Sequence, residues 1–136
     1  MTNIHFSKYH GLGNDYLFLD AIRYPEYSSL NFPDLARAMS DRRPGPGSDG
    51  IVIFSKIDSR KFQMRIFNSD GSEAENCGNA LRCIGRICRE RNYTESLEFT
   101  VQTMGGPVLI KLEANDTEYQ KIAVNMGHPI WEPDLI

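Results

Sequence analysis

Cys77 is the residue of this sequence whose type and position best suit chemistry. It follows an Asp70-Gly71 turn signal and stands where helical apolar spacing begins. The first turn of a helix has unpaired N–H groups and the positive end of the helix dipole, and both favour thiolate over thiol. Cys77 is therefore predicted to be a reactive thiol, with a buried structural cysteine at a helix start as the alternative.

Amide side chains and a glycine accompany this thiol. Gly78 leaves room for a ligand to approach, Asn79 adds an amide, and Asn14 and Asn68 lie on loops that could converge on the helix start. Amides and free helix N–H groups can hold a carboxylate by hydrogen bonds, and such a site can also hold a thiolate. These four residues and Cys77 form the candidate site.

The other two cysteines, Cys83 and Cys88, have spacings that suit neither zinc nor a disulfide. Zinc sites usually pair ligands as C-x2-C, whereas five and four residues separate these cysteines, and His128 is the only histidine downstream. On a helix Cys77 and Cys83 would lie on different faces, about 9 Å apart along the axis. We therefore predict no metal, and expect Cys83 and Cys88 to be small core residues.

The elements that must position the site are short strands around one long helix. The expected strands cover residues 16–20, 51–55, 62–66, 97–101, 108–112 and 119–124, after an alternating segment that starts at residue 4, and the expected helices cover residues 33–40 and 77–91. Hairpin turns join most of the strands, which favours an α+β fold over a doubly wound parallel sheet.

Two glycine-rich loops lie between these elements. The loop at residues 11–15 is interpreted as a turn between strands, because no helical pattern follows it as a phosphate loop would require. The loop at residues 43–50, with Pro44 and Pro46, is too rich in proline and glycine for a helix or a central strand. It could shape a pocket wall or simply connect two elements at the surface.

Composition indicates one globular domain. The chain has 136 residues, 40% of them apolar and 24% charged, with a net charge of −3. Such mild acidity offers no platform for nucleic acid or anionic lipid. No apolar run approaches the roughly 20 residues that cross a membrane, and no leader pattern opens the sequence, so we expect a cytoplasmic protein.

Four stretches of the sequence together resemble the N-terminal half of the diaminopimelate epimerase family. They are Phe-Ser-Lys-Tyr-His-Gly-Leu-Gly-Asn-Asp-Tyr at residues 6–16, Gly-Ser-Asp-Gly at 47–50, Met-Arg-Ile-Phe-Asn-Ser-Asp-Gly-Ser-Glu at 64–73 and Cys-Gly-Asn-Ala-Leu-Arg-Cys at 77–83. The segment Val-Asn-Met-Gly-His-Pro at 124–129 is similar to the passage where that family enters its second half. The stretches follow the family's order over nearly the whole chain.

The resemblance implies a fold and an organisation. The fold would be a single lobe in which an antiparallel or mixed β-sheet wraps around a central helix. Residues 1–124 would form the N-terminal epimerase lobe, and residues 125–136 the crossover toward a second lobe.

The resemblance also implies an activity and roles. The family interconverts LL- and meso-diaminopimelate without a cofactor, in the lysine and peptidoglycan pathway, using two cysteines on opposite sides of one α-carbon. Cys77 aligns with the first of these cysteines. Asn14, Asn68 and the Gly78-Asn79 backbone align with residues that hold the substrate.

One departure from the family concerns the second cysteine. Family members are about twice as long and carry it on a second, similar domain, whereas no cysteine follows Cys88 here. We therefore expect a truncated, split or cleaved lobe that is inactive alone, whose partner is the missing lobe or another copy of itself. A non-catalytic ligand-binding domain and a thiol-redox domain of the same fold are the alternatives.

Overall fold

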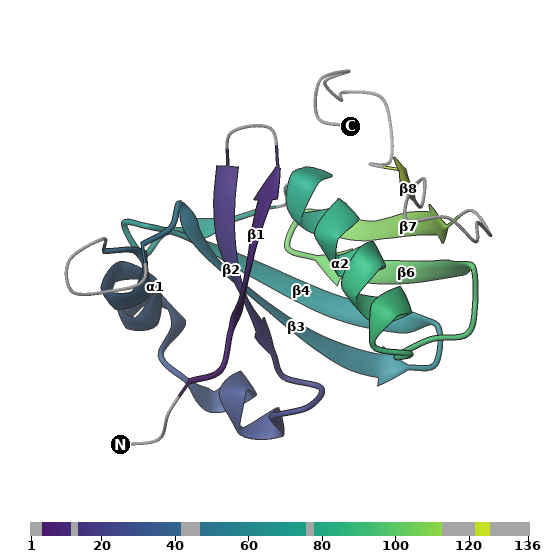
Figure 1. Cartoon of the computed structure of the whole chain (residues 1–136), viewed down its shortest axis with the longest axis horizontal. Coiled ribbons are helices and arrows are strands. Elements are labelled where there is room, and N and C mark those ends of the chain that lie inside the picture. The colour runs from purple at the N-terminus through teal and green to yellow at the C-terminus, as the bar shows by residue number, and fades with distance from the viewer. Residues whose placement is uncertain (1–3, 12–13, 42–46, 76–77, 113–121, 126–136) are drawn as a thin grey trace.

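The computed structural model describes residues 4–11, 14–41, 47–75, 78–112 and 122–125, which form one mixed sheet with helices on both of its faces (Figure 1). The strands are β1 (Ser7–Gly11), β2 (Asn14–Asp20), β3 (Gly50–Asp58), β4 (Lys61–Asn68), β5 (Glu73–Ala74), β6 (Glu98–Thr103), β7 (Gly106–Leu112) and β8 (Ile122–Asn125). The helices are the 3-10 helix η1 (Pro25–Ser29), α1 (Phe32–Ser40) and α2 (Gly78–Glu90). The predicted α+β class is confirmed.

The sheet has the strand order β1-β2-β3-β4-β6-β7-β8, with β5 paired to β4. Consecutive strands pair antiparallel, as hairpins do, in β1–β2, β3–β4, β4–β5, β6–β7 and β7–β8. The pairs β2–β3 and β4–β6 are parallel, because a helix-containing connection lies between their strands. Of the loop predicted at residues 11–15, Gly11, Asn14 and Asp15 instead belong to the β1–β2 hairpin, and residues 12 and 13 lie outside the described residues.

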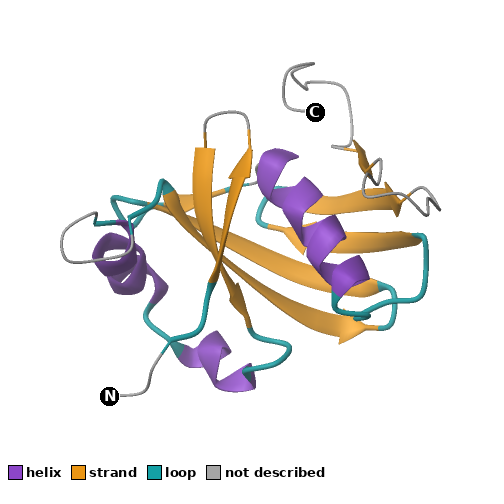
Figure 2. Ribbon diagram, viewed as in Figure 1, coloured by secondary structure: helices purple, strands orange, loops and turns teal. Residues whose placement is uncertain are grey.

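Helix α2 packs against one face of the sheet (Figure 2). Its apolar residues recur at helical spacing, so they form one broad side. With alternate residues of the strands they build a core, because successive strand residues point to opposite faces. This inner core contains Phe18, Val52, Phe54, Phe62, Met64, Ile66, Ala80, Leu81, Ile84, Ile87, Cys88, Phe99, Val101, Val108, Ile110 and Leu112. Cys88 is a fully buried member of this core, as expected, whereas Cys83 is only half-buried and packs against its margin.

Helix α1 and η1 cover the opposite face of β2, β3 and β4. This outer core contains Leu17, Leu19, Ala21, Tyr27, Phe32, Ala36, Met39, Ile51, Ile53 and Phe67. Strand β3 therefore buries side chains on both of its faces, which explains its unbroken apolar run. At the start of α1 the Asn31 side chain accepts a hydrogen bond from the Asp34 N–H at 3.1 Å, which satisfies one N–H of the first turn.

Two small elements escaped the sequence analysis, η1 and β5. Each is too short for periodicity to reveal, since η1 has five residues and β5 has two. The Pro44–Pro46 loop and residues 113–121 and 126–136 lie outside the described residues. The division at residue 124 therefore stays a prediction. In the described part of the chain no helix is long and apolar enough to cross a membrane.

Candidate functional site

One edge of the sheet gathers three of the segments that the candidate site requires. Gly50, the first residue of β3, pairs with Tyr16 of β2 on one side and with Asn68, the last residue of β4, on the other. Because neighbouring strands lie about 4.8 Å apart, the backbones of Tyr16 and Asn68 are about 10 Å apart. Asn14 begins β2 two residues before Tyr16, at this same edge.

Gly50 is a glycine because β3 and β4 approach closely at this edge. A Cβ atom on Gly50 would lie 2.4 Å from the Phe67 carbonyl oxygen, a distance that real side chains do not tolerate. The preceding Ser48 is buried, and its hydroxyl donates to the Gly50 carbonyl at 2.9 Å. The Gly-Ser-Asp-Gly motif thus packs the start of β3 against the end of β4.

Asp49 links the segments that carry Asn14 and Asn68. Its carboxylate accepts a hydrogen bond from the Asp15 N–H at 2.7 Å, and its own N–H donates to the Asp15 carbonyl at 2.8 Å. Its carbonyl accepts from the Ser69 N–H at 3.1 Å. One residue therefore joins the residue after Asn14 to the residue after Asn68.

The turn after Asn68 is a three-residue hairpin loop. The Gly71 N–H donates to the Asn68 carbonyl at 2.9 Å, the Asn68 N–H donates to the Ser72 carbonyl at 2.8 Å, and Gly71 has a left-handed φ of 91°. These bonds and the left-handed glycine form a hairpin loop closed by a glycine bulge, where the Asp70-Gly71 signal predicted a tight turn. The Asn68 side-chain amide donates to the Ser72 hydroxyl at 3.1 Å, so its orientation is defined.

Helix α1 supports this turn from outside. The Arg37 Nη1 donates to the Asp70 carbonyl at 3.1 Å, while its Nη2 forms an ion pair with Asp34 at 2.6 Å. The N–H and hydroxyl of Ser72 both donate to the Asp70 carboxylate, and these bonds hold the pKa of Asp70 below its usual value. The turn therefore carries a fixed negative charge at neutral pH.

Helix α2 begins a short distance after β5. Gly78 is its first residue and is buried, and Asn79 is half-buried. Three peptide units separate Gly78 from Glu75, a span of at most about 11 Å, and β5 just before Glu75 pairs with β4. In Figure 1 this end of α2 and the β1–β2 hairpin lie on the same, upper side of the molecule.

The five predicted site residues are thus known to different extents. Asn14 begins β2 and Asn68 ends β4 at one edge, and Gly78 and Asn79 begin α2 on the side of the molecule where the β1–β2 hairpin lies. Cys77 precedes Gly78 in the sequence and lies outside the described residues, as does the orientation of the Asn14 side chain. Within the described residues no three His, Cys, Asp or Glu side chains are grouped to hold a metal.

Cys88 differs chemically from the thiol expected at the helix start. Burial, followed by the negative charge of Asp20, raises the pKa of Cys88 to about 12. It is therefore protonated and unreactive at neutral pH, which agrees with its place in the inner core.

The sequence analysis missed the residues that connect these segments. Asp49 was noted only within a motif, and Arg37 was not singled out. Asp before Gly in a loop is a signal for side-chain to backbone bonding, which could have pointed to Asp49. The contact between Arg37 and the turn had no local signal, because 33 positions separate Arg37 from Asp70.

Comparison with known proteins identifies the family of this chain. The family model described as diaminopimelate epimerase matches residues 6–132. The chain belongs to the diaminopimelate epimerase family. It is 40% identical over 131 residues to the diaminopimelate epimerase of Methanococcus maripaludis, 41% to that of Acetivibrio thermocellus and 43% to that of Carboxydothermus hydrogenoformans. Each comparison covers 96% of this chain and 46% of the relative, so the chain spans about half the length of these diaminopimelate epimerases.

Solved structures of other proteins share the fold. A phenazine biosynthesis protein of the PhzF family from Bacillus anthracis matches with a TM-score of 0.59 and 19% identity, over 88% of this chain and 38% of that one. A hydroxyproline epimerase from Agrobacterium vitis, solved with bound trans-4-hydroxy-L-proline, matches with a TM-score of 0.54 and 16% identity, over 89% and 40% of the two chains. At such low identity these matches show that this chain shares their fold, and they carry no information about its ligand.

Proposed function

We propose that this chain is the N-terminal lobe of a cofactor-independent epimerase that interconverts LL- and meso-diaminopimelate. The observation that carries the proposal is the edge where β2 starts, β4 ends and α2 starts, in a chain of this family. It supplies a helix N-terminus next to Cys77 in the sequence, and two asparagines on fixed backbones. The N-terminus of a helix favours bound anions, which here would be a substrate carboxylate and a thiolate.

Proton transfer at the α-carbon is the step assigned to Cys77. As a thiolate it takes the proton from one face of the α-carbon, and the C–H electron pair stays on carbon as a carbanion. A thiol from the second lobe delivers its proton to the opposite face, so the configuration inverts and the two sulfurs exchange protonation states. With no cofactor to spread the charge, preorganised dipoles around the α-carboxylate must stabilise the carbanion, and water must be excluded.

The remaining site residues would bind substrate. The Gly78 and Asn79 N–H groups would hold the α-carboxylate at the start of α2, and the amides of Asn14 and Asn68 would hold its polar groups. Asn68 is suited to this because Ser72 orients its amide. Asp49 would keep the two asparagine-bearing segments at a constant separation.

The second thiol is proposed to come from a second lobe of the same enzyme. On this view residues 1–124 are inactive alone, residues 125–136 lead toward that lobe, and the assembled protein works in the cytoplasm, where thiols stay reduced. The alternative assembly to the two-lobe enzyme is a homodimer of this lobe.

Alkylation of single-thiol variants tests the proposal in the chain itself. A chain with Cys83→Ser and Cys88→Ser keeps Cys77 alone, and its iodoacetamide reaction should have a midpoint below the ordinary thiol pKa of about 8.5. The matched chain that keeps Cys88 alone should not react at neutral pH. A midpoint for Cys77 at or above 8.5 would contradict the thiolate role.

Turnover and oxidation tests separate the alternatives. The chain alone should give no meso product from LL-diaminopimelate, and product that disappears with Cys77→Ser would disprove the need for a second thiol. Mild oxidation should add one oxygen at Cys77, whereas loss of two hydrogens through an internal disulfide would support a thiol-redox domain.

A further inference from the structure

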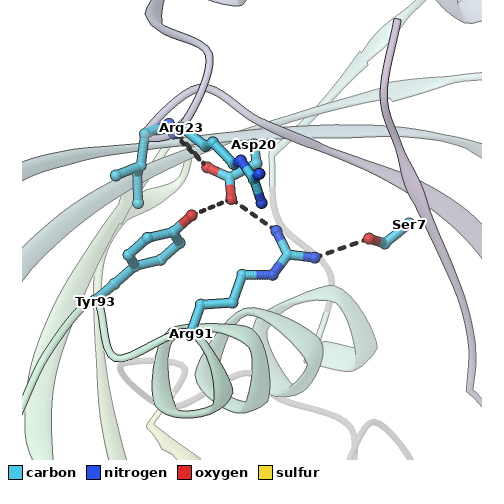
Figure 3. Close-up of polar contacts among 6 residues, drawn as sticks. Ser7, Asp20, Arg23, Arg91 and Tyr93 are labelled. Atoms are coloured by element: carbon cyan, nitrogen blue, oxygen red, sulfur yellow. Dashed lines mark hydrogen bonds and ion pairs between the residues drawn. The ribbon is translucent and has the colours of Figure 1, made fainter.

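A buried carboxylate that the proposed reaction does not use lies at the other end of α2. Asp20, the last residue of β2, is 5% exposed. Its Oδ1 accepts hydrogen bonds from the N–H groups of Ile22 and Arg23, both at 2.9 Å. Its Oδ2 accepts from Arg91 Nη1 at 2.7 Å and from the Tyr93 hydroxyl (Figure 3).

The end of α2 has the geometry that brings two of these donors to Asp20. Asn92 has a left-handed φ of 56°. The Tyr93 N–H donates to the Cys88 carbonyl at 2.9 Å, and the Asn92 N–H donates to the Arg89 carbonyl at 3.3 Å. These two bonds form a Schellman motif, which turns the chain so that Arg91 and Tyr93 reach the same carboxylate.

The Asp20 cluster joins α2 to three strands. Arg91 Nη2 donates to the Ser7 hydroxyl of β1 at 2.8 Å, as Figure 3 shows, and Asp20 belongs to β2. Lys56 of β3 donates from Nζ to the Tyr93 carbonyl at 2.8 Å. The apolar contacts of α2 are not directional, whereas these charge-assisted bonds have defined distances and angles. They can fix the helix along its axis in a way that the apolar core cannot.

We propose that Asp20 is a positioning residue that, through Arg91 and Tyr93, fixes α2 on the sheet and so sets where its N-terminus lies. Helix α2 has 13 residues and is about 20 Å long, so a displacement at its last turn moves its first turn as well. The relevance of this displacement to catalysis rests on the proposed function, since the candidate site stands at that first turn. The displacement itself does not depend on it.

Amide hydrogen exchange of variants tests the positioning. Asp20→Asn keeps the size of the side chain but removes the charge that pairs with Arg91. Arg86→Gln is the matched control, because it removes an exposed ion pair with Glu90, of 2.6 Å, on the same helix and leaves the hydrogen bonds of Asp20 in place. Exchange is compared at three places. The first is the N–H groups of Arg82 and Cys83, which close the first turn of α2. The second is the Arg91 N–H, which donates to the Ile87 carbonyl at 2.9 Å and closes the last turn, and the third is the Thr100 N–H of β6, which donates to the Arg60 carbonyl at 2.9 Å.

Asp20→Asn should speed exchange about tenfold at both turns of α2 relative to Thr100, because breaking a buried ion pair leaves one charge uncompensated. Arg86→Gln should leave all three places unchanged. Two outcomes would overturn the proposal. Faster exchange confined to Arg91 would indicate local fraying of the helix end, and an equal increase at Thr100 would indicate global destabilisation. If Asp20→Asn does not fold, Tyr93→Phe takes its place, because it removes only one of the donors to Asp20. Tyr93→Phe should show the same pattern more weakly. Unchanged exchange at the first turn of α2 in this variant would overturn the proposal.

The pH dependence of Cys77 alkylation, in folded variants, links the positioning to the site. Asp20→Asn should move the midpoint upward, while Arg86→Gln should not. A low midpoint that Asp20→Asn leaves unchanged would overturn the link to the site. An ordinary midpoint in the unaltered chain would contradict the proposed thiolate, and the exchange data would then decide the positioning on their own.

Discussion

At the scale of single residues, Gly71 and Gly106 have similar backbones and different surroundings. Both have left-handed φ values, 91° and 117°. A Cβ atom on Gly71 would lie 2.1 Å from Arg37 Nη1 and 3.1 Å from the Pro33 carbonyl, whereas one on Gly106 would meet no described atom within 4 Å. Gly71 is therefore required by the contact between α1 and the turn, as well as by its φ.

This difference gives a prediction with a built-in control. Gly106→Ala should lower the free energy of unfolding by about 1–2 kcal/mol, the cost of a left-handed alanine. Gly71→Ala should cost about 1 kcal/mol more, because Arg37 must leave the Asp70 carbonyl. Urea denaturation of both variants measures the difference, and equal losses would contradict the role of Arg37 in holding the turn.

At the scale of elements, the sequence predicted those whose signals are local. Apolar spacing predicted α2 within one residue at each end, and the β3–β4 and β6–β7 hairpins follow from alternating apolar segments separated by turn residues. The backbone conformation of residues that follow turn and capping rules, such as Gly71 and Asn92, is predictable from sequence, because their hydrogen-bond partners lie only a few positions away.

Elements and contacts whose partners are distant in sequence could not be predicted. The parallel pairs β2–β3 and β4–β6 depend on where α1 and α2 pack, which no local pattern encodes. Asp20 and Arg91 are 71 positions apart, and each alone looks like an ordinary surface charge. For the candidate site the sequence identified the residue types, whereas only the sheet register shows that the segments of Asn14 and Asn68 reach one edge.

The N-cap of α1 allows a prediction at this scale. Asn31→Ala removes the acceptor for the Asp34 N–H and should lower the free energy of unfolding by about 1 kcal/mol. Asn31→Asp keeps an acceptor and should be nearly neutral. Chemical denaturation measures both variants, and an Asn31→Asp loss as large as that of Asn31→Ala would show that the capping bond is not what stabilises α1.

At the scale of the whole molecule, the two cores share one sheet. The inner core packs against α2 and the outer core against α1, yet both use alternate residues of β2, β3 and β4. Loss of either core exposes strands on which the other depends, so the described part of the chain should unfold as a single cooperative unit.

Two titratable groups near the end of α2 make the stability of this cooperative unit depend on pH. Burial, followed by the Asp20 charge, raises the pKa of Cys88 from 9.0 to about 12. Burial, followed by the hydrogen bond to Asp20, raises the pKa of Tyr93 from 10.0 to about 12. The folded state therefore favours the neutral thiol and phenol, while the unfolded chain releases both protons at lower pH.

The sign of the pH effect follows from these shifts. Well below pH 9 both groups are neutral in either state and their contribution to stability is complete; it is lost as the pH rises through 9 toward 12. The free energy of unfolding should therefore fall across this window in the unaltered chain. Cys88→Ala should start from a lower stability, because it leaves a small cavity, but should fall less steeply. Urea titrations at several pH values measure how steeply the free energy of unfolding falls with pH in each chain. Lysine deprotonation is common to both chains and does not affect the comparison. Parallel slopes would mean that the Cys88 thiol does not resist ionisation in the folded state.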